Sequence, residues 1–309
     1  MSRLVPPYGL IRDGLRQARV IPFLGSGASL GGRGPDVAWE KDLAAYLPTG
    51  GELASHLARK TEFPSDEPLD LAKVAQYYNV VGGRELLHEE LHDIFNRDYS
   101  LTSLHTFLAE VSAPLLIVTS NYDDLIERAF SAKGRTYHIV IHTNNPTMGY
   151  QLFWWPPGEP KPQEVIPNKL DINLEVDTVI YKMHGAVDRH EPARDQYVIT
   201  EDDYIDFLAR MTKNRAIPSI FSRPFQTRHF LFLGYGLRDW NLRVILHRIA
   251  GEQRLNYQSW AIQRHPTILD EKFWGRRDVD ILDIDLARYI AAVRGRLRLL
   301  PQAEAATHA

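Results

Sequence analysis

The chain has 309 residues, of which 44% are hydrophobic, and its formal net charge is -3 at pH 7. These values are typical of a globular protein with one large or two modest domains, and they argue against a basic surface that binds nucleic acid directly. The absence of cysteine excludes disulfides, thiol nucleophiles and thiolate zinc sites. No apolar run reaches membrane-spanning length and the first residues lack an apolar signal core, so we expect a cytoplasmic protein.

Short apolar segments recur along the chain and predict strands. They lie at 20–24, 115–118, 137–141, 178–183, 197–200, 229–233, 259–262 and 279–282. Helical patterns separate most of them and the strands are apolar throughout, which predicts an α/β fold: a Rossmann-type parallel sheet with helices on both faces. Pro22 falls inside the first strand, which we expect to be short or bulged there.

Two segments depart from this alternation. At about 36–110 the pattern predicts a helical insertion over the ligand site, with helices near 51–60, 69–78 and 84–95. At about 144–169, Trp154, Trp155 and several prolines predict an ordered surface loop with inward tryptophans rather than a partner-docking arm. We therefore expect one domain over 1–302 and a frayed tail over 303–309.

The first predicted strand ends in a glycine turn formed by Gly25, Ser26, Gly27, Ala28 and Ser29. Glycine permits positive φ and close approach of a ligand, and free N–H groups at a strand-to-helix turn form an anion-binding nest. Position 30 is leucine, where a dinucleotide fingerprint has its third glycine, and no Gly-Lys-Ser/Thr follows. An ordinary turn after a buried strand is therefore the alternative interpretation.

Three later strands also end in polar or glycine-containing turns. These turns hold Thr119, Asn121 and Asp123, then His184, then Gly234, Tyr235 and Asp239. Carboxyl ends of parallel strands meet at the edge where ligands bind, and an imidazole there can take up a proton near neutral pH. The alternatives are that Ser120 or Asn121 caps the next helix, and that His184 is a hydrogen-bonded structural residue.

Together the four turns resemble the signatures of the bacterial sirtuin-like domain family. The motifs are Gly-x-Gly-x-Ser from Gly25, Thr-x-Asn-Tyr-Asp from Thr119, His-Gly at His184 and Phe-x-Gly-Tyr-x-x-x-Asp from Phe232. The order of the motifs matches over nearly the whole chain. The resemblance implies a Rossmann-type sheet with a helical module over NAD.

The same resemblance implies roles for individual residues. Gly25, Ser26, Gly27 and Ser29 would hold the pyrophosphate, Gly234 and Tyr235 would approach the adenosine, and Ala28, Thr119 and Asp239 would complete the cofactor site. Asn121 and Asp123 would address the nicotinamide ribose and carboxamide, and His184 would be the general base. Two positions depart from the family pattern: Ser120 stands where deacylases carry Gln, and Gly236 where relatives often have Ser.

Because deacylating sirtuins hold zinc with cysteine thiolates, the lack of cysteine favours another activity on NAD. Cleavage of the nicotinamide–ribosyl bond passes through an oxocarbenium-like state, which Asn121 and His184 could serve by orienting water and accepting its proton. The resemblance thus implies an NAD hydrolase that releases ADP-ribose and nicotinamide, with NAD as substrate and no zinc. A protein deacylase is a less favoured hypothesis.

Relatives of this kind commonly act in anti-phage defence by depleting NAD. The resemblance therefore implies a restrained effector, a homo-oligomer or a partner of an ATPase-like, helicase-like or nucleic-acid-guided protein. The alternative is a non-catalytic module that senses NAD or ADP-ribose within a defence complex.

A second motif belongs to another class of enzyme. His88-Glu89-Glu90-Leu91-His92 matches the H-E-x-x-H pattern of zinc proteases, with two imidazoles one helical turn apart. The alternative is an amphipathic helix with an apolar stripe at Leu87, Leu91, Ile94 and Phe95 and the histidines beside it. No third ligand follows the motif, so the amphipathic helix is favoured.

Overall fold

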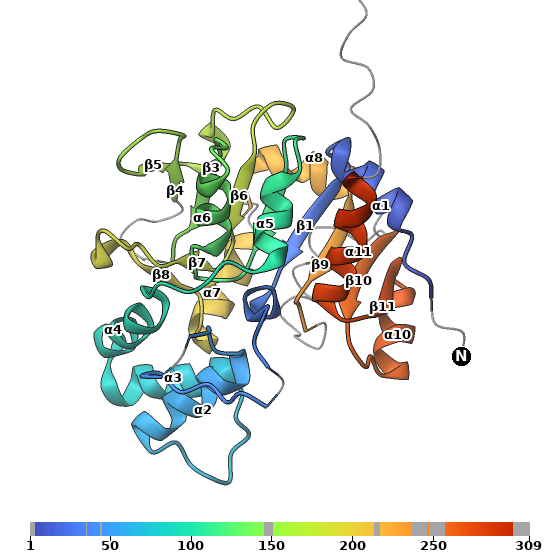
Figure 1. Cartoon of the computed structure of the whole chain (residues 1–309). Coiled ribbons are helices and arrows are strands. Elements are labelled where there is room, and N and C mark those ends of the chain that lie inside the picture. Colours follow the sequence, from blue (N-terminus) through green and yellow to red (C-terminus); the bar gives the residue numbers. More distant parts are fainter. Residues whose placement is uncertain are drawn as a thin grey trace, which may run out of the picture.

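The computed structural model describes residues 4–34, 36–43, 45–144, 151–212, 217–236, 246 and 257–298. Within them, nine strands form one sheet in the order β11-β10-β9-β1-β2-β6-β3-β4-β5 (Figure 1). The strands are β1 (Val20–Leu24), β2 (Leu116–Thr119), β3 (His138–His142), β4 (Leu152–Trp155), β5 (Gln163–Val165), β6 (Val179–Lys182), β9 (His229–Leu233), β10 (Ser259–Gln263) and β11 (Val279–Asp283). All neighbouring pairs are parallel except β3–β4 and β4–β5. The predicted α/β fold is confirmed.

Strand β1 lies in the interior of the sheet, with β2 on one side and β9 on the other. Ligands of open parallel sheets bind outside the carboxyl ends of the strands, where the strand order reverses. Strands β2 to β6 all lie on one side of β1, whereas β9, β10 and β11 lie on the other side, so that reversal falls between β1 and β9. We therefore expect a ligand site at the turns after these two strands.

The bulge predicted at Pro22 is absent. Pro22 stands in regular register with Leu231 of β9, while β2 pairs only with Phe23 and Leu24. The missing N–H of Pro22 thus falls in a stretch of β1 that has no register partner in β2. A central strand can carry proline under that condition.

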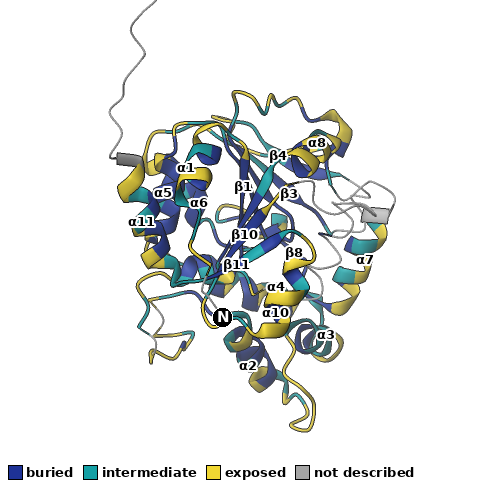
Figure 2. Cartoon of the chain, turned by 90° about the vertical axis from the view of Figure 1, so that its right-hand side faces the viewer, coloured by how far each residue is buried: buried dark blue, intermediate teal, exposed yellow. Residues whose placement is uncertain are grey.

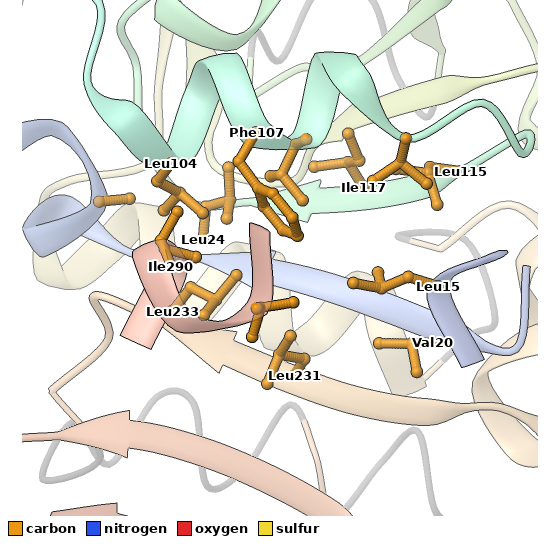
Figure 3. Close-up of a cluster of buried hydrophobic side chains, with 14 of the residues drawn as sticks. Leu15, Val20, Leu24, Leu104, Phe107, Leu115, Ile117, Leu231, Leu233 and Ile290 are labelled. Atoms are coloured by element: carbon orange, nitrogen blue, oxygen red, sulfur yellow. The ribbon is translucent and has the colours of Figure 1, made fainter. Parts of the chain in front are cut away.

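Side chains of β1 alternate between two apolar layers, as expected for a strand covered on both faces. Val20 and Leu24 join the layer beneath α1 (Tyr8–Arg16), α5 (Ser103–Glu110), α6 (Leu125–Ala132) and α11 (Leu286–Arg298), part of which Figure 3 shows. Ile21 and Phe23 join the opposite layer, to which α7 (Glu201–Thr212), α8 (Ser219–Thr227) and α10 (Ile268–Gly275) contribute. Buried strands run through the middle of the molecule, and exposed residues concentrate on the outer helices (Figure 2).

Three helices between β1 and β2 form a third core of their own. They are α2 (Gly50–Thr61), α3 (Leu71–Gly82) and α4 (Arg84–Phe95), which lie together at the bottom of Figure 1. Thr49 and Glu52 form a capping box that fixes the start of α2. This core also includes Tyr122 and Tyr197, so the helices are packed onto the segments that follow β2 and β6.

Two strand predictions need correction. The strand expected at 197–200 is only β8 (Gln196–Tyr197), which pairs with β7 (Gly185–Ala186) in a separate small sheet. Beyond Tyr197 the backbone donors of Ile199 and Thr200 go to the carboxylate of Asp203 in α7 rather than to a strand. The excursion at 144–169, expected as a loop, contains β4 and the edge strand β5, with its described prolines outside them.

Both tryptophans of this excursion are half-buried, and Trp154 packs inward against the same apolar layer as Ile21 and Phe23, as predicted. Trp154 Nε1 donates to Nδ1 of His138 at 3.0 Å, and Trp155 Nε1 donates to the carbonyl of Glu159 at 2.9 Å. Among the helices of the described ranges, none is both long enough and apolar enough to cross a membrane. The predicted tail at 303–309 lies outside the described residues.

The buried His105 and the half-buried His88 predict acid sensitivity of the fold. Burial lowers the pKa of His105 to about 4, and burial with the nearby Arg84 lowers the pKa of His88 to about 4. An unfolded histidine has a pKa of about 6.5, so between the two values only the unfolded state takes up the proton. The free energy of unfolding should therefore fall as the pH drops from about 6.5 to about 4. Urea denaturation at pH 7.5 and pH 5.0 tests this, and His105→Gln should reduce the difference; equal stability at both pH values would contradict it.

Candidate functional site

The four turns predicted to share one edge of the sheet do lie side by side, in the order β9, β1, β2 and β6. The N–H of Gly25 donates to the carbonyl of Leu233, and that of Ser120 to the carbonyl of Leu24, at 3.1 and 3.2 Å. The N–H of Met183 donates to the carbonyl of Thr119 at 3.0 Å. Each turn is thus registered against its neighbour by backbone hydrogen bonds.

The turns after β1 and β9 are in direct contact through their glycines. The N–H of Gly27 donates to the carbonyl of Gly234 at 2.8 Å, and Gly234 has a positive φ of 67°. A Cβ on Gly25 would lie 2.8 Å from the same carbonyl and 2.6 Å from the ring of Tyr235. Contact between the two turns therefore already requires glycine at these positions, before any ligand is considered.

Asn121 joins the turn after β2 to the turn after β1. Its Nδ2 donates to the carbonyl of Gly25 at 3.0 Å and to Oγ of Ser29 at 3.2 Å. Ser29 in turn donates to Oδ2 of Asp123 at 2.9 Å. The interpretation of Asn121 as a helix cap is wrong, since the N–H of Leu125 at the start of α6 is accepted by Asp123 Oδ1.

A buried ion pair supports this turn from below. Lys182, the last residue of β6, is 1% exposed and donates to the backbone carbonyl of Asp123. Its Nζ also lies 2.9 Å from Oε1 of Glu127 in α6. The position of the Asp123 backbone thus depends on a charge pair that lies behind it.

His184 follows β6 and is 3% exposed. Its ring packs nearly perpendicular to the rings of Tyr204 and Phe207, with ring centroids 5.4 and 5.5 Å away. Its Nε2 is buried and has no hydrogen-bond partner within the described ranges. Burial lowers the pKa of His184 to about 4, so the imidazole is neutral at physiological pH.

These turns enclose a cavity of about 470 Å³, which we call the first cavity. Of the predicted site residues, it is lined by Gly25, Ser26, Ser29, Asn121, Asp123, His184 and Tyr235. Gly27, Ala28, Thr119 and Gly234 do not line it and instead hold the turns together, and Asp239 lies outside the described residues. The amide and imidazole predicted as catalytic therefore face one cavity together with the first glycine turn.

Helices α2 and α3 supply walls of the first cavity that sequence reasoning missed. Thr49 and Gly50 at the start of α2, and Asp70, Leu71 and Ala72 at the start of α3, line it. Both helices thus present their N-terminal ends to the cavity, where a helix dipole favours negative charge. The Thr49-x-x-Glu52 capping box was the available sequence signal for α2.

No lysine or arginine lines the first cavity within the described ranges, whereas two carboxylates, Asp70 and Asp123, do. A bound pyrophosphate would have to be held by backbone N–H groups and helix N-termini rather than by cations. A positive charge that develops inside the cavity would not meet a competing cation. The site therefore suits a ligand that is anionic at one end and becomes cationic at the other.

The H-E-x-x-H motif lies on α4 and its side chains are engaged elsewhere. His88 Nε2 accepts from Arg84 at 2.9 Å, and His92 Nδ1 lies 2.7 Å from Oδ2 of Asp195. Glu90, at a variable position of the motif, is paired with His56 and Lys41, and the motif's own Glu89 is exposed. Across the described part of the chain, no group of three or more His, Asp or Glu side chains is arranged to hold a metal ion.

The fold and the site define a doubly wound α/β protein whose cavity lies at the switch point of the sheet, beneath a helical module. The chain belongs to the SIR2-like domain family, whose model matches residues 115–282. This match includes the turns that hold Asn121, His184 and Gly234. The resemblance drawn from the four motifs is confirmed.

Several curated proteins are similar to this chain. The NAD(+) hydrolase ThsA of Enterococcus faecium is 29% identical over 74% of this chain and 41% of its own length, and ThsA of Bacillus cereus (strain MSX-D12) is 26% identical over 77% and 45%. Defense-associated sirtuin 2 of Bacillus subtilis is 22% identical over 88% of this chain and 24% of its own length. This chain thus spans less than half the length of these relatives. A crystal structure of a Sir2 homolog–NAD complex aligns over 96% of both chains with 14% identity and a TM-score of 0.39.

The contact between the two glycine turns can be tested by adding one methyl group. Gly234→Ala should destabilise the protein, because the new Cβ would overlap the backbone nitrogen of Ala28 and φ is positive. We expect a loss of about 1–3 kcal/mol in the free energy of unfolding, the usual range for a strained backbone position. Gly236→Ala is the matched control, since its Cβ would meet no described atom within 4 Å. Equal unfolding free energies for the two variants would contradict the packing role.

Proposed function

We propose that this protein is an NAD hydrolase that cleaves the nicotinamide–ribosyl bond to give ADP-ribose and nicotinamide. The observation that carries the proposal is the first cavity, where the buried neutral His184 and Asn121 face the same space as the Gly25 turn. The names of the ThsA relatives, which are NAD(+) hydrolases, point in the same direction.

In this proposal the pyrophosphate binds at the Gly25–Ser26 turn and the N-terminal end of α2, because the carboxylate of Asp70 already caps the first N–H groups of α3. Backbone N–H groups and helix dipoles hold phosphate oxygens without a cationic side chain. Tyr235 and Gly236 would take the adenosine side, since they follow the neighbouring strand β9 and line the same cavity. The nicotinamide riboside would then extend towards Asn121 and His184.

The proposed chemistry is displacement of nicotinamide by water. The bond between the anomeric carbon and the pyridinium nitrogen breaks with its electron pair going to the nitrogen, so nicotinamide leaves neutral and positive charge develops on the ribose. A water oxygen forms the new bond to the anomeric carbon, and its proton passes to His184 and then to solvent. Because no cationic side chain lies in the described walls of the first cavity, no positive charge there opposes the cationic ribose.

The two polar atoms of the Asn121 side chain have different roles in this scheme. Its Nδ2 is used between the turns, and no described residue donates to or is bonded with its Oδ1. Oδ1 is therefore the atom that would accept from a ribose hydroxyl or from the attacking water. Asp123, with both carboxylate oxygens hydrogen-bonded to Ser29 and Leu125, would act by positioning Ser29 rather than by touching the substrate.

The proposal extends to the biological setting. The name of the Bacillus subtilis relative, a defense-associated sirtuin, supports a role in anti-phage defence by NAD depletion. Such an activity must be restrained in the uninfected cell, so we propose a cytoplasmic protein controlled by self-association or by a partner protein. We further propose that residues 1–302 act as one catalytic domain, with the helices of about 36–110 covering the substrate.

The first test removes the two groups that face the reaction. His184→Ala should lower the rate of nicotinamide release from NAD by about 10²- to 10⁴-fold, the usual contribution of a general base. Asn121→Asp retains Oδ1 but loses the Nδ2 donor, whereas Asn121→Ala loses both, so Asp should be the less damaging of the two. Thermal melting checks that each variant is folded, and chromatography of NAD, ADP-ribose and nicotinamide measures turnover. Wild-type turnover by folded His184→Ala would remove this residue from the mechanism.

A non-catalytic sensor of NAD is distinguished by the same measurement. If the protein is a sensor, the wild-type protein should bind NAD but release no nicotinamide under any condition, including the presence of proteins encoded beside it. Calorimetric binding of NAD without turnover would thus replace the hydrolase by the sensor. Release of acyl groups from acyl-lysine peptides would instead indicate a deacylase.

The low pKa of His184 makes a second prediction about rate and pH. A base with a pKa of about 4 stays neutral from pH 7.5 to pH 5.5, so kcat/KM should change by no more than about twofold across that range. A histidine with the ordinary pKa of about 6.5 would instead give roughly a tenfold fall by pH 5.5. Initial rates of nicotinamide release in that interval, where the protein is monitored for unfolding, decide between the two.

A further inference from the structure

A second cavity of about 420 Å³ is lined by Lys182 at the end of β6 and by residues that follow it in the chain. Its walls come from α6, from β3, from the Trp155–Glu159 turn after β4 and from the segment Ala186–His190. No residue lines both this second cavity and the first. The proposed NAD chemistry therefore leaves it unexplained.

Glu127 brings an acceptor without a donor to the second cavity. Its side chain is 10% exposed, and its Oε1 lies 2.9 Å from Nζ of Lys182. Its Oε2 is buried and accepts no hydrogen bond from the residues that the structure describes. A buried carboxylate oxygen left in this state costs free energy, which a bound hydrogen-bond donor would recover.

Arg135 brings the complementary group, a donor without an acceptor. Its Nη2 reaches the carbonyls of Ser112 and Ala113 at 3.3 Å, and its guanidinium lies 5.3 Å from the ring centroid of Phe130. Its Nη1 is buried and finds no acceptor among the described residues, although Arg135 lines the second cavity. A ligand oxygen could satisfy this group.

The remaining charges around the second cavity are neutralised within the protein. Asp124 lies 2.7 Å from Nε of Arg189, and Asp188 lies 2.6 Å from Nε of Arg194. The other ionisable side chains of the wall, Glu159 and His190, belong to exposed residues. Arg135 is bonded only to carbonyls, but the acidic side chains of the wall (Asp124, Glu127, Glu159 and Asp188) outnumber the basic ones (Arg135, Lys182 and Arg189). The described wall therefore has no net positive charge to bind a phosphate.

The rest of the wall is apolar and aromatic. Ile139, Ile141, Ala186 and Val187 form one side, and the half-buried indole of Trp155 lies at the end of β4. Flat apolar walls with a few polar groups at fixed places are typical of sites for small uncharged molecules with a ring. The polar groups then fix the orientation of the ring.

We propose that the second cavity binds a small uncharged ring compound that donates a hydrogen bond to Oε2 of Glu127 and accepts one from Nη1 of Arg135. A primary carboxamide carries a donor and an acceptor in one group, and the vicinal hydroxyls of a nucleoside sugar carry them in two. The ring would lie between the aliphatic side chains and Trp155. This proposal does not depend on cleavage of NAD.

The test titrates the full chain with nicotinamide, with adenosine and with inorganic phosphate by isothermal calorimetry. At least one of the two neutral probes should bind, and its identity distinguishes carboxamide from sugar recognition. Glu127→Gln keeps the acceptor Oε1 for Lys182 but turns Oε2 into a donor, so affinity should fall at least about tenfold, the scale of a hydrogen bond to a charged group. Arg135→Gln should weaken the same probe.

Two controls separate this site from the first cavity and from general effects of charge. Arg276→Gln makes the same substitution at an exposed arginine that does not line the second cavity and should leave binding unchanged. Asn121→Ala alters the first cavity and should also leave it unchanged. A probe lost in Asn121→Ala but retained in Glu127→Gln binds the first cavity, and this outcome overturns the proposal.

The proposal also fails if phosphate is the only probe that binds, or if neither neutral probe binds to wild-type protein. Circular dichroism and thermal melting establish that each variant is folded. If Glu127→Gln does not fold, Arg135→Gln and Trp155→Ala carry the test, and wild-type affinity in both would overturn it. NAD turnover plays no part in these outcomes, so a failed hydrolase assay leaves them intact.

Discussion

The site depends first on the contact between two glycine turns at the centre of the sheet. Gly27 donates to the carbonyl of Gly234, and neither turn leaves room for a Cβ at the point of contact. This contact sets the direction in which the chain leaves β1, and so it sets where Ser26 and Ser29 face the first cavity. Glycine is thus required by the protein's own backbone, and any approach of a phosphate uses a turn that is already fixed.

From that contact a chain of hydrogen bonds continues through the turns after β1 and β2 to Lys182 at the end of β6 and Glu127 in α6. Asn121 joins the turns after β1 and β2, Asp123 fixes Ser29, and Lys182 holds the Asp123 carbonyl while paired with Glu127. Burial raises the pKa of Glu127 while Lys182 opposes that rise, so the pair is held in a costly environment. Such a pair is weak evidence for stability. Both residues line the second cavity, and Lys182 also holds the Asp123 turn of the first cavity, so a role in function explains the pair better.

The sequence predicted the parts of this arrangement that depend on local pattern. Continuous apolar runs identified β1 and β9 with the residues that the structure gives them, and the turns after four strands fell on one edge. It failed where the deciding partner is distant, since Glu127 meets Lys182 across 55 residues. It also failed where a nearby side chain replaces a strand partner, since Asp203 accepts from the backbone N–H groups of Ile199 and Thr200 just after β8. Asn121 looked like a helix cap because local pattern cannot reveal a bond to Gly25, 96 residues away.

The environment of His184 connects the fold to the proposed chemistry. A buried imidazole with a pKa of about 4 is a weak base in the free protein, which makes it poorly suited to activate water before the bond to nicotinamide begins to break. As nicotinamide leaves, positive charge on the ribose acidifies the attacking water, so a weak base suffices at that stage. A histidine with a higher pKa would carry a positive charge beside the developing cation in part of the molecules near neutral pH, and that charge would oppose the reaction. In the proposed mechanism the contacts of His184 with Tyr204 and Phe207 would keep the base neutral while the substrate becomes cationic.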